Sequence, residues 1–144
     1  MIHILDTDLM TLVELPDSPE YARLRAHIAQ LPHDDIVATT VVTYEEQTRG
    51  WLAYAAKSRS VDHQVKAYSR LRRHLLNYVG WSVLDFDIHA AHEFQRLRSM
   101  RIRIGTSDLK IAAITLSLGA KLLSRNSSDF AQVPGLKVED WTRH

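Results

Sequence analysis

The sequence has no cysteine, which excludes disulfide bonds, thiolate nucleophiles and zinc sites built on cysteine. It also has no apolar run long enough to span a membrane. The N-terminal residues Met1–Asp6 lack the basic region and the long apolar run of a targeting signal. No internal repeat, low-complexity segment or linker interrupts the chain. We therefore expect a soluble, cytoplasmic protein that has no membrane partner.

An excess of charge of one sign is missing as well. Lysine and arginine number 18 against 17 aspartates and glutamates, which gives a formal net charge of +1. This balance neither demands nor excludes a nucleic-acid ligand, because a basic face can occur within a nearly neutral total. The composition, 45% hydrophobic and 24% charged, is that of an ordinary globular protein. We expect one domain over residues 1–144, long enough to bury roughly 70% of its unfolded surface.

Short apolar runs alternate with segments of helical periodicity along the whole chain. The apolar runs predict strands over residues 2–5, 36–39, 81–84, 120–124 and 136–138. The periodic segments predict helices over residues 9–15, 19–31, 42–56, 62–79, 88–98 and 108–118. This alternation is typical of an α/β fold with a mostly parallel sheet.

The longest predicted helix, residues 62–79, carries one apolar face. We expect that face to point toward the core, since apolar side chains at helical spacing normally mark the buried side of a helix. Its members are Val65, Tyr68, Leu71, Leu75 and Leu76.

The stretch Arg103–Phe130 is the most informative part of the chain. We expect Thr106 or Ser107 to cap a helix whose first turn carries Asp108. That helix is apolar on nearly every side, which is typical of a buried helix. A short strand follows it, and then comes a polar turn that contains Asp129. One acid is therefore expected at the start of a buried helix and another just after a buried strand.

Four acids share this kind of position: Asp6, Glu46, Asp108 and Asp129 each follow a predicted strand or lie in the first turns of a helix. In a parallel sheet such positions lie along one edge. Carboxylates gathered there would repel one another unless a cation joined them. Oxygen ligands without a thiolate favour Mg²⁺ or Mn²⁺. Such metals typically activate water for phosphoryl transfer.

Each acid taken alone has a simpler explanation. Asp6 or its neighbour Asp8 could cap the helix that follows, and Asp108 could offset a helix dipole. Asp129 could form a turn, and Glu46 could be a solvated helix residue. The joint placement of the acids at one edge is what favours a metal site.

Glu45 and Glu46 compete for one place, because adjacent helical residues point about 100° apart. Glu46 shares a face with Gly50 and Ala53, small residues that would let the helix approach the sheet closely. Glu45 and Arg49 have the spacing of an exposed ion pair. We therefore expect Glu46 to face inward.

Four segments of the chain form a recognisable set. They are Leu5-Asp6-Thr7-Asp8, Thr43–Gly50, Ile104–Ala113 and Ser124–Phe130. The C-terminal segments Val133–Leu136 and Val138–Trp141 belong to the same set. Together these segments resemble the PIN-domain nucleases, and within them the VapC group of bacterial toxin–antitoxin toxins. The resemblance spans essentially the whole chain and implies a PIN-like three-layer α/β/α fold.

The resemblance implies a ribonuclease that depends on Mg²⁺ or Mn²⁺. Asp6 and Asp108 would be metal ligands, Glu46 and Asp129 would complete the catalytic site, and the supporting residues would be Thr7 and Asn126. It further implies hydrolysis of RNA phosphodiester bonds by water without a covalent intermediate. It also implies a homodimer that a small antitoxin protein holds inactive. Asp8 departs from the family, which often has Asn or Ser there.

Basic residues could bind the RNA backbone. The densest basic run lies between Arg96 and Arg103, although cations are also favoured near a helix C-terminus without any ligand. The expected RNA contacts are Arg49, Arg101, Arg103 and Arg125. His89, His92 and Glu93 share a helical face but are expected to be ordinary surface residues.

Two other classes of protein share parts of this pattern. Ile4–Asp8 also resembles the first motif of haloacid-dehalogenase-type phosphatases, in which the first aspartate is a nucleophile. A receiver-like signalling or binding domain would instead use Asp85 as its phosphate acceptor. Both classes need a later lysine that we cannot place in this sequence.

Overall fold

The computed structural model describes residues 1–143, and its centre is a five-stranded sheet. The strands lie in the order β3-β2-β1-β4-β5, and every described pairing is parallel. Their bounds are β1 Ile2–Leu5, β2 Ile36–Thr40, β3 Ser82–Leu84, β4 Lys121–Leu123 and β5 Lys137–Glu139. The five strands expected from the sequence are thus confirmed, with ends that differ by one residue at most.

Seven helices connect these strands in the described chain. Their bounds are α1 Thr7–Leu12, α2 Pro19–Ala29, α3 Val41–Ala56, α4 Val61–Val79, α5 Ile88–Ser99, α6 Thr106–Ser117 and α7 Ser127–Phe130. The short α7 occupies what the sequence presented as a turn. Within residues 1–143 no helix is both long and apolar enough to cross a membrane.

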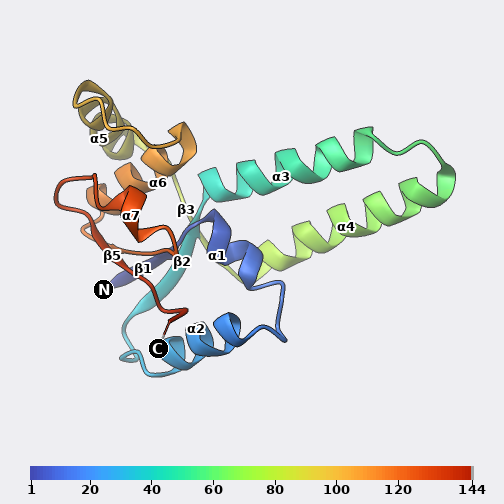
Figure 1. The fold of residues 1–144 in the computed structure, drawn as a ribbon, viewed down its shortest axis with the longest axis horizontal. Helices are drawn as coiled ribbons and strands as arrows, with labels where there is room; N and C mark the ends of the chain where they lie inside the picture. Colours follow the sequence, from blue (N-terminus) through green and yellow to red (C-terminus); the bar gives the residue numbers. More distant parts are fainter. Residues whose placement is uncertain (144) are drawn as a thin grey trace.

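Alternation along the central strands divides the core into two layers, one on each face of the sheet. Ile4 and Leu122 point into a cluster with residues of α5, α6 and α7. Their neighbours Leu5 and Leu123 point into a second cluster with residues of α1 and α2. The result is the three-layer α/β/α arrangement expected from the sequence, with α5 and α6 on one side of the sheet and α1 and α2 on the other (Figure 1).

Helix α6 is the most deeply buried helix of the described chain. Ile111, Ala112, Ala113 and Ile114 have no exposed surface at all, which confirms the prediction from its all-round apolar sequence. Its N-cap is Gly105, and no side chain caps it. The expectation of a Thr106 or Ser107 cap was therefore wrong, because the helix begins at Thr106, one or two residues earlier than those caps would require.

Helices α3 and α4 form a long hairpin that projects from the body of the molecule (Figure 1). Helix α4 packs mainly on α3, through Ala67, His74 and Tyr78. The apolar face expected to point inward is instead largely in solvent: Val65, Tyr68, Leu75 and Leu76 are 50–66% exposed, and only Leu71 is half-buried. That prediction was wrong, because the spacing shows which residues share a face but not what covers it.

Candidate active site

A hollow of about 510 Å³ opens at the carboxyl edge of the sheet, beside the ends of the adjacent strands β1 and β4. Because these strands are parallel neighbours, the segments that follow them meet at the same edge. Helix α3 adds a side chain from its second turn, and helix α6 adds one from its first turn. The lining residues are Asp6, Thr7, Asp8, Glu46, Asp108, Arg125 and Asn126.

Asp6 is the most buried acid of this hollow, with 3% of its surface exposed. It caps helix α1, since one carboxylate oxygen accepts a hydrogen bond from the Leu9 N–H at 2.9 Å. The other oxygen accepts one from the Ser124 hydroxyl at 2.6 Å. Burial raises the pKa of Asp6 to about 6, and the charges of Asp8 and Asp108 add to the rise against these two hydrogen bonds. Asp6 is therefore both a helix cap and an unusually basic carboxylate.

Glu46 reaches the hollow from α3, and Thr7 fixes its position. The Thr7 hydroxyl donates to Glu46 Oε1 at 2.6 Å and lies 3.1 Å from the Thr43 hydroxyl. Glu45 points away and pairs with Arg49 at 2.6 Å on the exposed side of the helix. The expected division between the two glutamates is thus the one that the structure has.

The reason given for that division was wrong. Gly50 and Ala53 are exposed, and no atom lies within 4 Å of the position that a Gly50 side chain would take. Helix α3 approaches the sheet through its first turn instead, where Val42 and Thr43 are buried. Glu46 lies one turn further on, and this short distance from the buried turn places it at the edge of the sheet.

Asp108 lies in the first turn of α6, half-buried at the hollow. Burial raises its pKa, and repulsion from Glu46 and Asp129 raises it further. The two acids with raised pKa values, Asp6 and Asp108, are the two expected from the sequence to be metal ligands. A nearby cation would stabilise the ionised form of both carboxylates.

Asn126 lines the hollow, and Asp129 lies behind it. The Asn126 side-chain amide donates to Asp129 at 3.0 Å, and its backbone N–H donates to the Ser124 hydroxyl oxygen at 2.9 Å. Asp129 itself does not line the hollow and acts on Asp108 through its charge. Ser124 was not predicted as a site residue. Its place in the motif that ends at Phe130 was the only signal in the sequence.

The donors of this hollow suit Mg²⁺ or Mn²⁺ in kind, because they are carboxylate, hydroxyl and amide oxygens. The raised pKa values of Asp6 and Asp108 fit a site that a cation stabilises. The acids do not converge on one point, however. Among residues 1–143 no three acidic or histidine side chains are grouped closely enough to hold an ion together. The structure brings the predicted acids to one hollow without forming a complete ligand shell.

The arginines expected to bind RNA lie in different places. Arg125 lines the hollow and pairs with Asp8 through two contacts of 2.7 Å. Arg49 is held by Glu45 on the outer side of α3. Arg101 and Arg103 are exposed in the segment between α5 and α6 and do not line the hollow.

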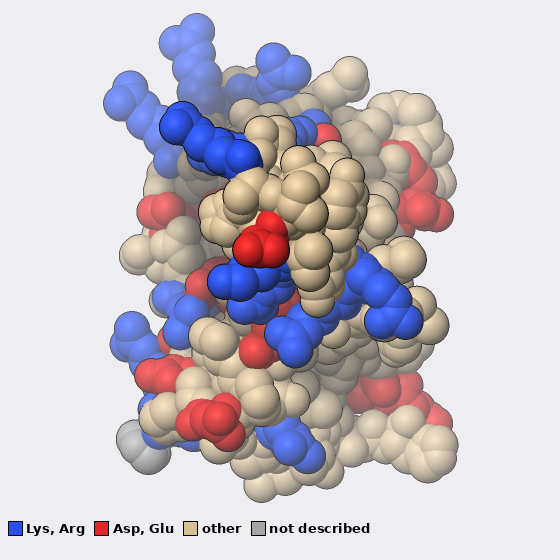
Figure 2. All heavy atoms as spheres, turned by 90° about the vertical axis from the view of Figure 1, so that its right-hand side faces the viewer, with Lys and Arg blue, Asp and Glu red and all other residues tan. Residues whose placement is uncertain are grey.

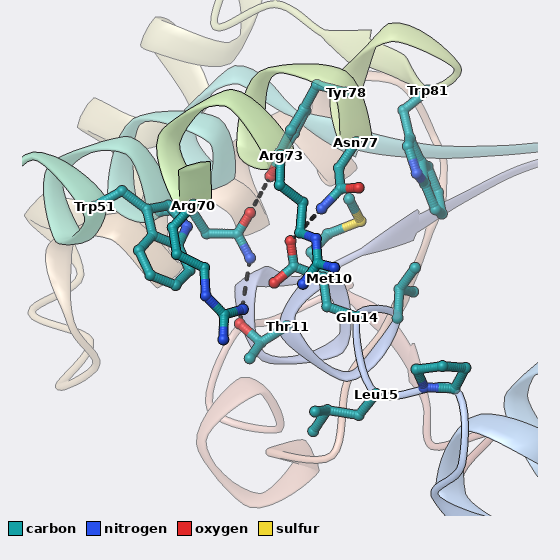
Figure 3. Close-up of a pocket in the computed structure, with 13 residues that line it drawn as sticks. Met10, Thr11, Glu14, Leu15, Trp51, Arg70, Arg73, Asn77, Tyr78 and Trp81 are labelled. Atoms are coloured by element: carbon teal, nitrogen blue, oxygen red, sulfur yellow. Dashed lines mark hydrogen bonds between the residues drawn. The ribbon is translucent and has the colours of Figure 1, made fainter. Parts of the chain in front are cut away.

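A second, larger hollow of about 670 Å³ lies next to the first, between α1, α3 and α4 (Figure 3). Met10, Trp51 and Trp81 give it an apolar lining, and Arg70 and Arg73 enter it from α4. Sequence reasoning missed this hollow, because its residues come from distant segments and form no motif.

The two hollows are lined by neighbouring residues of α1 and α3. Thr7 and Glu46 line the first hollow, and Thr11 and Gln47 line the second. The Gln47 side-chain amide donates to the Thr11 hydroxyl at 3.2 Å. The second hollow therefore begins one helical turn along α1 from the acids.

The fold and the site together define an α/β protein with a carboxylate-lined hollow at the edge of a parallel sheet, an arrangement suited to metal-assisted phosphodiester hydrolysis. The PIN domain model matches residues 4–136. This chain belongs to the PIN domain family.

The relatives agree with this family. The chain is 27% identical over 143 residues to Ribonuclease VapC1 of Haemophilus influenzae strain R2866, which covers 99% of this chain and 100% of the relative. Its fold is similar to the solved structure of VapBC-1 from nontypeable Haemophilus influenzae, with a TM-score of 0.78 and 24% identity over 99% of this chain and 100% of that one. A toxin–antitoxin complex from Klebsiella pneumoniae has a similar fold, with a TM-score of 0.65 and 21% identity over 96% and 97% of the two chains.

The two other classes considered from the sequence gain no support. Both classes need a lysine beside the acids, and no lysine of the described chain lines the hollow. Asp85, the acceptor of a receiver-like domain, is exposed after the edge strand β3 and does not line the hollow.

Proposed function

We propose that this protein is a Mg²⁺- or Mn²⁺-dependent endoribonuclease, a VapC-like toxin that acts in the cytoplasm as one PIN domain. Its family and the ribonuclease that covers its full length support this proposal. The observation that carries it is the gathering of Asp6, Glu46 and Asp108 around one hollow at the carboxyl edge of the sheet.

Asp6 and Asp108 would hold the metal ion, and Glu46 and Asp129 would complete the site. When bound, the ion supplies the positive charge that activates water and stabilises the transition state of phosphodiester hydrolysis. Water attacks the phosphorus directly, so that no covalent intermediate with the protein forms.

The neighbouring residues position these acids. Ser124 donates to Asp6, Thr7 donates to Glu46, and Asn126 donates to Asp129, so each of the three carboxylates has a hydroxyl or amide partner. Such outer partners fix the direction in which a ligand presents its oxygen. Arg101 and Arg103 would contact the RNA backbone further from the cleaved bond.

Cleavage of RNA by the purified protein tests this function. We expect cleavage with Mg²⁺ or Mn²⁺, none with EDTA, and none from Asp108→Asn in either condition. Asp62→Asn is the matched control, because Asp62 lies in the first turn of α4 and far from the hollow. Cleavage that persists in EDTA, or that survives Asp108→Asn, would contradict the proposal.

The toxin assignment has its own test. Expressed alone, the wild type should arrest bacterial growth, and Asp108→Asn should not. Harmless expression of folded, metal-loaded wild type would contradict the toxin assignment and leave the ribonuclease assignment standing.

The proposed partners are a small antitoxin protein and a second copy of the chain. The α3–α4 hairpin has exposed surface that could bind each of them. Residues 41–79 carry seven lysines and arginines against three acids, and Figure 2 shows basic side chains gathered around the end of the hairpin. The hollow of Figure 3, with its apolar lining and its two arginines, suits an acidic segment of an antitoxin that carries a large apolar side chain.

The exposed apolar face of α4 suits the second copy, since contiguous exposed apolar surface is typical of an interface. Arg70→Glu with Arg73→Glu should weaken copurification with the antitoxin, and Leu75→Lys should shift the protein from dimer to monomer. A loss of both partners in both variants would contradict this division of surfaces.

A further inference from the structure

Arg125 and Asp8 form an ion pair at the mouth of the acid-lined hollow. Arg125 Nε lies 2.7 Å from one carboxylate oxygen of Asp8, and Nη2 lies 2.7 Å from the other. Asp8 comes from the first turn of α1, and Arg125 comes from the loop between β4 and α7. The pair joins two segments that are 117 residues apart in the sequence. It therefore closes part of the rim of the hollow.

The charges around this pair are very uneven. Four carboxylates line the hollow, those of Asp6, Asp8, Glu46 and Asp108, and Arg125 is the one lysine or arginine of the described chain that lines it. An RNA phosphate that approaches the acids meets repulsion from each of them. Arg125 is the side chain there that can attract the phosphate. Its guanidinium has the fork geometry that binds phosphate and carboxylate in the same two-contact way.

Asp8 differs from the acids beside it. Its side chain is 48% exposed, whereas Asp6 is buried. Asp6, and not Asp8, caps helix α1. Among the hydrogen bonds of residues 1–143, the Asp8 carboxylate accepts from Arg125 alone. No backbone group of the described chain donates to the Asp8 carboxylate, so Arg125 is its one hydrogen-bond partner there, although the charge of Asp8 also helps to raise the pKa of Asp6.

We propose that Asp8 occupies the place of an RNA phosphate. In the free protein it holds Arg125 at the rim, and on binding RNA the guanidinium exchanges the carboxylate for a phosphate next to the acids. Asp8 is then a positioning residue that competes with RNA for Arg125 and sets the affinity for substrate. This inference rests on the ribonuclease function proposed above. Exposed ion pairs contribute little free energy, so a contact between Arg125 and a phosphate can replace the one with Asp8.

The proposal predicts that replacing Asp8 strengthens RNA binding instead of weakening it. Asp8→Asn frees Arg125 and should tighten RNA binding about three- to tenfold, seen as a lower KM. A metal ligand or a merely structural residue would give the opposite result, a loss of activity or of folded protein. Arg125→Gln should raise KM, and Arg125→Lys should recover part of the affinity through its charge.

The decisive measurement is the double-mutant cycle of Asp8→Asn and Arg125→Gln. With Arg125 replaced, Asp8→Asn should change KM less than about twofold, because only the removal of one negative charge remains. The matched control is Glu45→Gln, which frees Arg49 from a similar ion pair on the outer side of α3 and should leave KM unchanged. Circular dichroism establishes that each variant is folded. RNA binding, measured by fluorescence anisotropy with EDTA, should follow the same order as KM.

Three results would overturn this inference. They are an unchanged or higher KM for Asp8→Asn, an equal fall of KM with Arg125 present and replaced, and an equal effect of Glu45→Gln. RNA affinities of the wild type and its variants that follow this order, with no cleavage by the wild type, would contradict the proposed ribonuclease function and support the exchange at Arg125. The two proposals therefore fail separately.

Discussion

The acid-lined hollow and the α3–α4 hairpin differ in how completely their side chains are buried and hydrogen-bonded within the chain. At the hollow, Asp6 is buried and both of its oxygens accept hydrogen bonds from the chain itself. On the hairpin, Val65 and Leu75 lie in solvent although they belong to one apolar face. The hollow is thus fixed by the fold of a single chain, whereas the hairpin leaves part of its apolar surface exposed.

This difference separates the two tasks of the protein. Chemistry requires carboxylates in fixed places, and the parallel sheet supplies them because adjacent strands end at one edge. Recognition of partners requires surface that remains available, and in the proposed function the projecting hairpin supplies it. Substitutions in the two regions should therefore have different consequences, which the following predictions use.

The largest effect is expected where the two regions meet on one helix. Glu46→Gln should lower the rate of RNA cleavage on the order of 100-fold or more, because Glu46 faces the acids. Glu45→Gln changes the neighbouring residue, which pairs with Arg49 on the outer side, and should lower the rate less than about twofold. Single-turnover cleavage by both variants measures the ratio. Equal losses would contradict the orientation of α3.

The second prediction compares two leucines. Leu123→Ala removes a fully buried side chain of β4 and should lower the free energy of unfolding by about 2–5 kcal/mol. Leu75→Ala removes a side chain that is 58% exposed, and should change it by less than about 0.5 kcal/mol in dilute protein. Urea denaturation measures both. A large loss from Leu75→Ala in the monomer would mean that the chain itself covers this face.

The third prediction concerns the pH dependence of stability. The pKa of Asp6 is about 6 in the folded protein and 3.8 as its ordinary value, so the folded state binds more protons between these two pH values. Stability in EDTA should therefore fall as pH rises from about 4 to 6 and then stay level. Asp6→Asn removes this penalty, and should be more stable than wild type at pH 7.5 by up to about 3 kcal/mol. Near pH 4 the difference should vanish, and denaturation curves at the two pH values measure it.

Much of the fold followed from the sequence, because its signals are local. The buried helix α6 was predicted from an all-round apolar run, and its residues Ile111 and Ile114 are indeed fully buried. The four predicted acids were placed near strand ends, and a parallel sheet brings three of them to one hollow, with Asp129 close behind. Local pattern and simple topology were sufficient for this part.

The remainder depends on contacts between distant segments. The face of α4 around Leu75 was expected to be buried, because spacing cannot show whether the chain or a partner covers a face. The hydroxyl of Ser124 that donates to Asp6, and the pairing of Asp8 with Arg125, join residues 117 or 118 positions apart. No pattern within one segment carries such information.

The central claim, that the hollow is a metal site, is tested most directly by melting curves of wild type and Asp108→Asn at pH 7.5, each with EDTA and with Mn²⁺. Burial and neighbouring acids raise the pKa of Asp108, so without metal the Asn variant should melt at a higher temperature than wild type. Mn²⁺ at a hundredfold over its dissociation constant should stabilise wild type by about 2.7 kcal/mol, which is roughly 5–10 °C, and should shift the Asn variant little. A lower melting temperature for Asp108→Asn in EDTA, together with the same response of both proteins to Mn²⁺, would contradict the claim.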